Sequence, residues 1–218
     1  QVPQYVAANA SRVPTQNAPP RPRDGQFDLK PAGEQVNNIT RQGFRLAERN
    51  ALFAAKEQFV QALRMAAQTL DARDGGDRHL RDLTGALTAL DEAEDFAPKG
   101  GTVIDSLNVT EIVGSHRTQI FPPGATQQLS SLEALQYYYQ FAQQQMTSAT
   151  GEIRNTADAY FGLGKVHSLL TQDAGPLTQL HAARAIVFQQ TALAIHPDHD
   201  KASNELGVML ARHGQWGE

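Results

Sequence analysis

The chain has 218 residues, of which 40% are hydrophobic and 19% charged, and its formal net charge is −4. This composition is typical of a globular protein, and the mild acidity gives no general attraction to nucleic acid or to an anionic membrane. The absence of cysteine excludes disulfides and thiolate metal sites, and no apolar run approaches the length of a membrane span. The first residue is Gln1 rather than methionine, as after removal of an export signal or at the boundary of a longer chain, and we expect an extracytoplasmic or cell-envelope location.

Residues 1–40 are rich in Pro, Gln, Asn and Ala and have almost no periodic apolar pattern. Pro19, Pro20 and Pro22 favour an extended, polyproline-like backbone. Such a segment buries too little apolar surface to offset the entropy of ordering it, unless it lies on its own helices or on another chain. The sequence therefore predicts an extended N-terminal arm that ends at about residue 40.

Residues 41–98 predict a long helical hairpin. The first helix runs from Arg41 to Asp71 and carries two apolar stripes, so we expect it to be covered on two sides, as an inner helix would be. One stripe contains Leu46, Phe53, Val60, Leu63, Ala67 and Leu70, and the other contains Phe44, Ala47, Ala51, Ala55, Phe59, Ala62 and Ala66. The ARDGGD segment at 72–77 ends this helix, and a second helix follows from about His79 to Phe96, before Pro98.

Residues 99–129 predict an irregular connector. Glycines and prolines bracket two strand-like pieces, TVI at 102–104 and TQIF at 118–121. Asn108 and Glu111 have the spacing of a capping box for a single helical turn. An irregular stretch of this length within a compact domain often marks function.

Residues 130–218 predict a helix followed by further helical hairpins. Ser130 and Glu133 form a capping box for the helix that contains YYYQF at 137–141. Three adjacent tyrosines cannot all face one core, so at least one should reach solvent, the arm or a partner. Three more helices are expected at about 156–170, 178–196 and 200–213.

The spacing around Pro197 resembles the tetratricopeptide repeat, a helix–turn–helix unit of 34 residues. The matching residues upstream of the proline are Tyr160, Leu163, Gly164, Ala185, Ala192, Leu193 and Ile195, and those downstream are Leu206, Gly207, Leu210, Gly214 and Trp216. Residues 171–179 form an insertion in the turn of the first unit. The resemblance covers residues 156–218, and more loosely 41–98, where Ala86, Ala93 and Pro98 repeat the Ala, Ala, Pro spacing. Small residues at Ala185, Ala192 and Gly207 would let paired helices approach closely.

The resemblance implies an all-α fold in which antiparallel hairpins stack as a short right-handed solenoid with a concave, ligand-binding face. By position, that face comprises Asp158, Phe161, Lys165, Ser168 and Leu169 in one repeat and Lys201, Asn204, Val208, Ala211 and Arg212 in the next. Family members that clamp a terminal carboxylate use a lysine and an asparagine where this chain has Phe161 and Lys165, so that activity is not expected. Asn204 to Glu218 matches a first helix and its turn without the second helix, so we expect either a longer chain or another chain over this end.

Two segments resemble ligand-binding motifs. GLGK at 162–165 lacks the earlier glycine and the Ser or Thr of a phosphate loop, so we interpret Gly162 and Gly164 as close-packing positions. HPDHD at 196–200 combines imidazole and carboxylate groups that could bind zinc, but a turn after a repeat helix is usually polar and solvated.

Two further segments offer chemistry of another kind. DEAED at 91–95 places four acids at a helix C-terminus, where the macrodipole disfavours them. They are either a solvated face or a site for cations or a basic partner. His116 and Arg117 in the connector could take part in catalysis only with a nucleophile and an orienting acid close by.

These features predict a non-enzymatic scaffold for protein–protein interaction, a structural subunit of a larger assembly associated with a bacterial envelope. Protein partners would bind in the groove, along the arm and at the open C-terminal repeat, with no cofactor, metal, nucleic acid or membrane span. The alternative is a soluble adaptor that binds a peptide or client transiently in its concave groove. A third reading is an enzyme that uses His116, if it lies in a concave pocket beside an acid.

Overall fold

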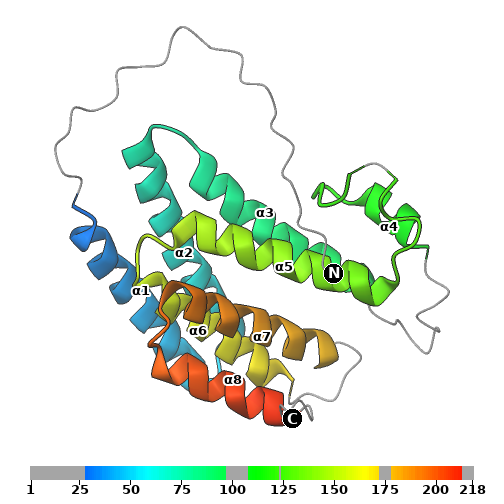
Figure 1. The fold of residues 1–218 in the computed structure, drawn as a ribbon. Helices are drawn as coiled ribbons and strands as arrows, with labels where there is room; N and C mark the ends of the chain where they lie inside the picture. The colour runs from blue at the N-terminus through cyan, green and yellow to red at the C-terminus, as the bar shows by residue number, and fades with distance from the viewer. Residues whose placement is uncertain (1–27, 97–107, 123, 172–177, 213–218) are drawn as a thin grey trace, which may run out of the picture.

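The computed structural model describes residues 28–96, 108–122, 124–171 and 178–212, and this part of the chain is helical with no β-strand (Figure 1). The predicted all-α class is confirmed. The helices are α1 (Lys30–Glu48), α2 (Leu52–Asp74), α3 (Arg78–Glu92), the 3-10 turn η1 (Ala93–Phe96), α4 (Val109–Ser115), α5 (Ser131–Thr150), α6 (Thr156–Leu170), α7 (Thr178–Ile195) and α8 (Asp200–Arg212).

Helix α2 is the central helix of the fold. It packs against α1, α3, α5 and α6. The predicted coverage on two sides is confirmed along α2, because the α2 members of both stripes are buried except for Phe53, which is 77% exposed. Phe53 lies in the first turn of α2, beyond the surface that the neighbouring helices cover.

The predicted arm and the predicted long first helix are both wrong in their boundaries. Helix α1 begins at Lys30, within the expected arm, and its buried face of Ala32, Val36, Thr40 and Gly43 is too poor in large apolar residues to stand out in the sequence. The helix ends where Asn50 adopts a left-handed conformation with φ of 60°. The expected helix over 41–71 is therefore two helices joined by a tight turn, and residues 1–27 of the expected arm lie outside the described residues.

Phe59 joins three helices. A Cβ atom added to Gly43 of α1 would lie 2.6 Å from the Phe59 ring, and one added to Gly162 of α6 would lie closer still. The Phe44 ring meets Phe59 edge-on at a centroid distance of 5.0 Å. Helices α1 and α6 thus approach α2 closely because each presents a glycine to the same buried ring.

The α2–α3 turn is capped by a residue of the preceding helix. Both carboxylate oxygens of Asp71 accept hydrogen bonds from the first turn of α3, from the His79 N–H at 2.8 Å and the Leu80 N–H at 2.9 Å. Asp71 is buried, so these bonds satisfy its charge as well as two free donors of the helix end. Helix α3 then packs along α5 as an antiparallel pair.

The connector between α3 and α5 carries α4 and lies at one end of this pair (Figure 1). The Asn108 side chain accepts from the Glu111 N–H, which is one of the two bonds of the predicted capping box. TQIF at 118–121 is not a strand, and TVI at 102–104 lies outside the described residues. The backbone N–H groups of Arg117 and Thr118 donate to the Glu92 carboxylate, so hydrogen bonds to a helix end replace strand pairing here.

The C-terminal helices agree with the predicted boundaries to within one residue. The capping box of Ser130 and Glu133 at the start of α5 is confirmed. Helices α6 and α7 form a hairpin, and α8 packs against α7. Asp158 pairs with His199 and Lys165 with Glu205, so α6 and α8 lie side by side and run in the same direction.

Gly43→Ala should lower the free energy of unfolding by about 1–3 kcal/mol, because the new methyl group must displace the Phe59 ring. The matched control is Gly85→Ala in α3, where an added Cβ meets no described atom within 4 Å. That variant should gain up to about 1 kcal/mol from helix propensity alone. Urea unfolding of both variants measures the difference. Equal stabilisation by the two alanines would mean that α1 does not pack on Phe59 as described.

Candidate functional site

The α6 half of the predicted concave face makes contacts within the chain. The Asp158 carboxylate lies 3.1 Å from Nε2 of His199. Lys165 Nζ and Ser168 Oγ both donate to Glu205 of α8, at 3.0 and 3.4 Å. These side chains join α6 to α8 rather than line an open groove.

Helix α1 also covers part of this predicted face. The Phe161 ring packs between Phe44 of α1, at a centroid distance of 5.9 Å, and the His199 ring, at 5.3 Å. Leu169 is partly buried. Phe161 is therefore a packing residue that holds α1 and α8 against α6.

The α8 half of the predicted face is open. Lys201, Asn204, Val208 and Arg212 are exposed, and Ala211 is partly exposed. The opposite face of α8 is buried at Ala202 and Met209. We call these five predicted residues, Lys201, Asn204, Val208, Ala211 and Arg212, the α8 face.

Gly207 does not show the expected close packing. It is exposed, and a Cβ added to it would meet no described atom within 4 Å. Trp216 and Gly214, which the resemblance places after it, lie outside the described residues. By contrast, the packing interpretation of GLGK is confirmed, because Gly162 contacts Phe59 and Gly164 contacts the Gln189 side chain.

His199 in HPDHD is a capping residue. It is only 6% exposed, its Nδ1 accepts from the Ala202 N–H at 3.1 Å, and its Nε2 faces the Asp158 carboxylate. The expected solvated turn is thus wrong for His199, whose two nitrogens are engaged within the chain. Asp198, in contrast, is exposed.

The acids of DEAED bind basic and backbone groups of the same chain. Asp91 and Glu94 pair with the buried guanidinium of Arg184 at 3.0 and 2.8 Å. Asp95 lies 3.4 Å from His116 Nε2, and Glu92 accepts from the connector backbone. Arg184 thus offsets part of their unfavourable position at a helix C-terminus, while Asp91 is also 75% exposed to solvent.

His116 lies beside an acid, as the enzyme reading requires, but in a packed environment. Its Nδ1 lies 2.6 Å from the Tyr138 hydroxyl, and the Phe96 ring packs against it. Tyr138 is fully buried, and this burial, with the charge of Glu92, raises the pKa of its hydroxyl far above the usual value. The contacts from Asp95 through His116 to Tyr138 therefore hold the connector against α5. The Tyr138 hydroxyl is buried and out of reach of a substrate.

The neighbouring tyrosines are also covered in part. Tyr137 packs edge-on against Phe121 of the connector, and Tyr139 is partly buried. Burial raises the pKa of Tyr139 to about 12. Tyr137 and Tyr139 are both partly exposed, as expected of at least one tyrosine, and Tyr137 also contacts the connector.

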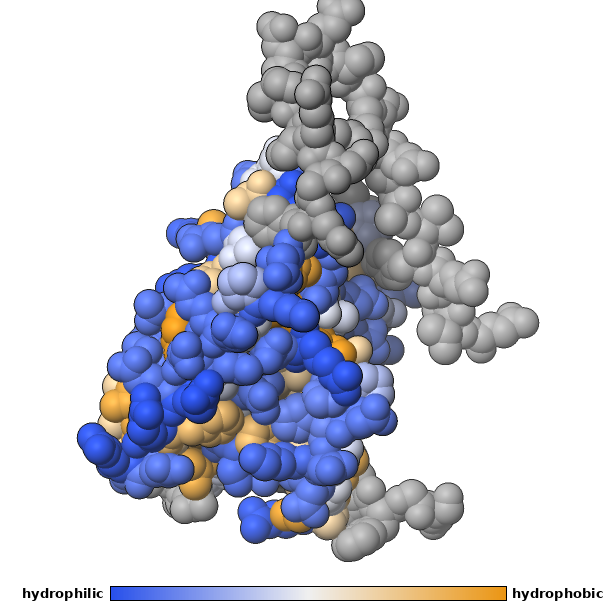
Figure 2. Space-filling model, turned by 90° about the vertical axis from the view of Figure 1, so that its left-hand side faces the viewer, coloured by the Kyte–Doolittle hydropathy of each residue, from blue (hydrophilic) through white to orange (hydrophobic). Residues whose placement is uncertain are grey.

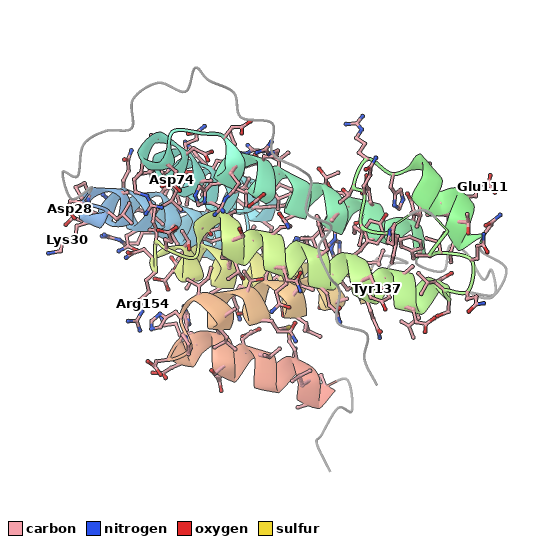
Figure 3. All side chains as sticks on the ribbon, turned by 45° about the horizontal axis from the view of Figure 1, so that its top comes forward. Asp28, Lys30, Asp74, Glu111, Tyr137 and Arg154 are labelled. Carbon is pink, nitrogen blue, oxygen red and sulfur yellow. The ribbon has the colours of Figure 1, made fainter. Side chains whose placement is uncertain are left out.

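One cluster of potential metal ligands occurs among the described residues, at the end of the molecule opposite the connector. Figure 3 shows Asp74 at this end and Glu111 of α4 at the other. Ligand atoms of Asp74, His79 and Glu152 lie within 4.8 Å of one another. Arg73 donates to both carboxylates, however, and the two His79 nitrogens contact the Ala149 carbonyl and Asp74. Arg73 thus supplies the positive charge that a metal would bring.

This ion-pair cluster joins the α2–α3 turn to the α5–α6 turn. The hydrogen bonds from Arg73 hold the pKa of Asp74 well below its usual range, and those to Glu152 lower the pKa of that carboxyl too. Both carboxylates are close to half exposed, so solvent screens part of the attraction.

Comparison of the chain with models of known protein families, with curated protein sequences and with solved structures finds no match. Among the described residues, no helix combines the length and the apolar character needed to cross a membrane. Figure 2 shows that the side of the molecule on which α1 lies is predominantly hydrophilic, with hydrophobic residues in small separate groups.

The lowered pKa values of Asp74 and Glu152 predict a specific pH dependence. Their stabilising effect is present above the ordinary values of 3.8 and 4.5 and is lost as the pH falls, because the unfolded chain then binds more protons. Arg73→Gln should therefore flatten the loss of stability below about pH 4.5. Thermal unfolding midpoints measured from neutral pH down to about pH 2.5 test this. Arg78→Gln, on the exposed start of α3, is the control and should keep the wild-type slope.

Proposed function

We propose that this chain is a non-enzymatic, helical-repeat scaffold for protein–protein interaction, and a structural subunit of a larger, bacterial envelope-associated assembly. The observation that carries the proposal is the arrangement of α6, α7 and α8. Helices α6 and α8 are parallel neighbours, and α7 packs against both. In the tetratricopeptide resemblance these helices are the first and second helices of one repeat and the first helix of the next, stacked as the start of a right-handed solenoid.

The burial of the matching residues supports this reading. Tyr160, Leu163, Ala185 and Ala192 are fully buried, as the small and large packing positions of such a repeat would be. The Tyr160 hydroxyl lies 3.2 Å from the Met146 carbonyl, which ties α6 to the end of α5. The hairpin is thereby fixed to the preceding helix pair, as stacked units require.

The α8 face is the proposed binding surface for a protein partner. It combines two cations, Lys201 and Arg212, with an amide at Asn204 and the apolar Val208, which is 40% exposed. Such a mixed surface suits an extended or helical partner segment with some negative charge. Lys165 and Asp158, the α6 residues of the predicted face, bind Glu205 and His199 and so hold α8 in place.

The non-enzymatic part of the proposal rests on how the histidines are used. The ring nitrogens of His79, His116 and His199 contact groups of the chain itself, and His116 faces a buried tyrosine. Each of these side chains joins two segments of the fold, which is a structural role.

Native mass spectrometry of the protein from its natural source tests the assembly. We expect a complex heavier than one chain, and Val208→Glu with Lys201→Glu should dissociate it by placing two acids on the α8 face. Arg78→Glu, on the exposed start of α3, is a charge-reversal control and should leave the complex intact. A monomer in every case would refute the assembly and favour a transient adaptor.

Deletion of residues 1–27 further distinguishes an assembly subunit from a transient adaptor. The deletion stops before α1, because Ala32 and Val36 are part of the core and loss of residues up to 40 would unfold the hairpin. In an assembly that the arm holds together, the shortened chain should leave the complex. A transient adaptor should keep its partner with unchanged affinity.

A further inference from the structure

A cleft of about 190 Å³ lies among α2, α3, α6 and α7, apart from the α8 face. Its lining combines apolar side chains with three cations. The lining residues are Lys56, Glu57, Val60, Arg64, Leu87, Leu90, Asp91, His167, Arg184 and Phe188.

The floor of the cleft is apolar and firmly packed. Val60, Leu90 and Phe188 are at most 5% exposed, and they come from three different helices. Leu87 is partly exposed beside them. The apolar contact open to a ligand is therefore small and comes mainly from Leu87 above this packed floor.

Two of the cations have no carboxylate partner among the described residues. Lys56 and Arg64 lie two turns apart on α2, on either side of Val60, so all three are on one face of that helix. Of the two acids in the lining, Glu57 is exposed at the rim and Asp91 pairs with Arg184. Lys56 and Arg64 therefore offer positive charge above an apolar floor.

Arg184 is the third cation and is held at the edge of the cleft. Its Nη2 contacts the Leu90 carbonyl, Asp91 and Glu94, while its Nε is buried and has no hydrogen-bond partner. A buried donor without an acceptor is costly, so an oxygen that reached it would stabilise the fold. The two acids on Arg184 also mean that the cleft as a whole has no large excess of positive charge.

Two histidines, His167 in the lining of the cleft and His181 next to it, have pKa values that are lowered chiefly by burial. Nδ1 of His167 lies 3.2 Å from Nδ1 of His181. Burial, followed by the charges of Arg184 and Lys56, lowers the pKa of His167 to about 3. Burial and Arg184 lower the pKa of His181 as well. The His167 ring is thus neutral at physiological pH.

We propose that this cleft binds a small organic monocarboxylate, with its apolar body on Val60, Leu90 and Phe188 and its carboxylate towards Lys56 and Arg64. The apolar floor selects against a purely inorganic anion. The acids on Arg184 and at the rim select against a multiply charged one. This binding site goes beyond the proposed scaffold function, because none of its residues belongs to the α8 face.

Calorimetry and imidazole NMR of the full chain test the site with three probes. Hexanoate has both the charge and the apolar body, hexanamide has the body without the charge, and inorganic phosphate has charge without the body. We expect saturable binding of one hexanoate, with shifts of the His167 and His181 signals. Hexanamide and phosphate should bind at least about tenfold more weakly, since each lacks one of the two contributions.

Lys56→Gln and Arg64→Gln should each weaken hexanoate binding by about tenfold. Both side chains lie at the surface of α2, so the variants should fold, and circular dichroism checks this. The control is Arg78→Gln on the exposed start of α3, which should bind hexanoate like the wild type. The site is wrong if hexanoate leaves the two histidine signals unmoved, if hexanamide or phosphate binds as tightly, or if both α2 variants bind normally.

Discussion

The close contact of Phe59 with two glycines is the constraint on which the rest of the structure depends. A side chain at Gly43 or Gly162 would push α1 or α6 away from α2. With both helices in place, Phe44 and Phe161 complete an aromatic cluster that extends to His199 at the start of α8. The position of α8, and so of its exposed face, follows from a packing contact made two helices away.

Ion pairs are the second organising element, and they join segments that are far apart in the sequence. Arg184 of α7 binds the acids at the end of α3, while Arg73 of α2 binds Glu152 beyond α5. Removing the acids that pair with the buried Arg184 would leave its charge unpaired, so these pairs specify the arrangement more strongly than they stabilise it. The contacts of Arg184 also provide Asp91 and Glu94, two acids of the DEAED segment, with a cation from the same chain.

The sequence predicts helix ends well where a cap or a proline marks them, as at Ser130 and Pro197, and poorly where packing depends on small residues. The buried face of α1 is made of Ala, Gly, Thr and a single valine, so no apolar stripe distinguishes it from the preceding segment. The concave face illustrates the other limit. The resemblance assigns both Lys165 and Lys201 to the concave face. Only the fold shows that Lys165 pairs with Glu205. Arg184, a lone arginine in the apolar α7, is the sequence feature that could have indicated the cleft. The acids that pair with it lie some ninety residues earlier, so the sequence alone does not connect them.

The two proposed surfaces lie on different sides of α6. Ser168 points to Glu205 of α8, while the adjacent His167 points to the cleft and to His181 of α7. Communication between the surfaces would need an element with two alternative arrangements. Helix α6 is instead fixed on both sides, by Phe59 at Gly162 and by Gln189 at Gly164. A carboxylate in the cleft should therefore leave the α8 face unchanged, and a ligand-dependent partner affinity would place the moving element outside α6.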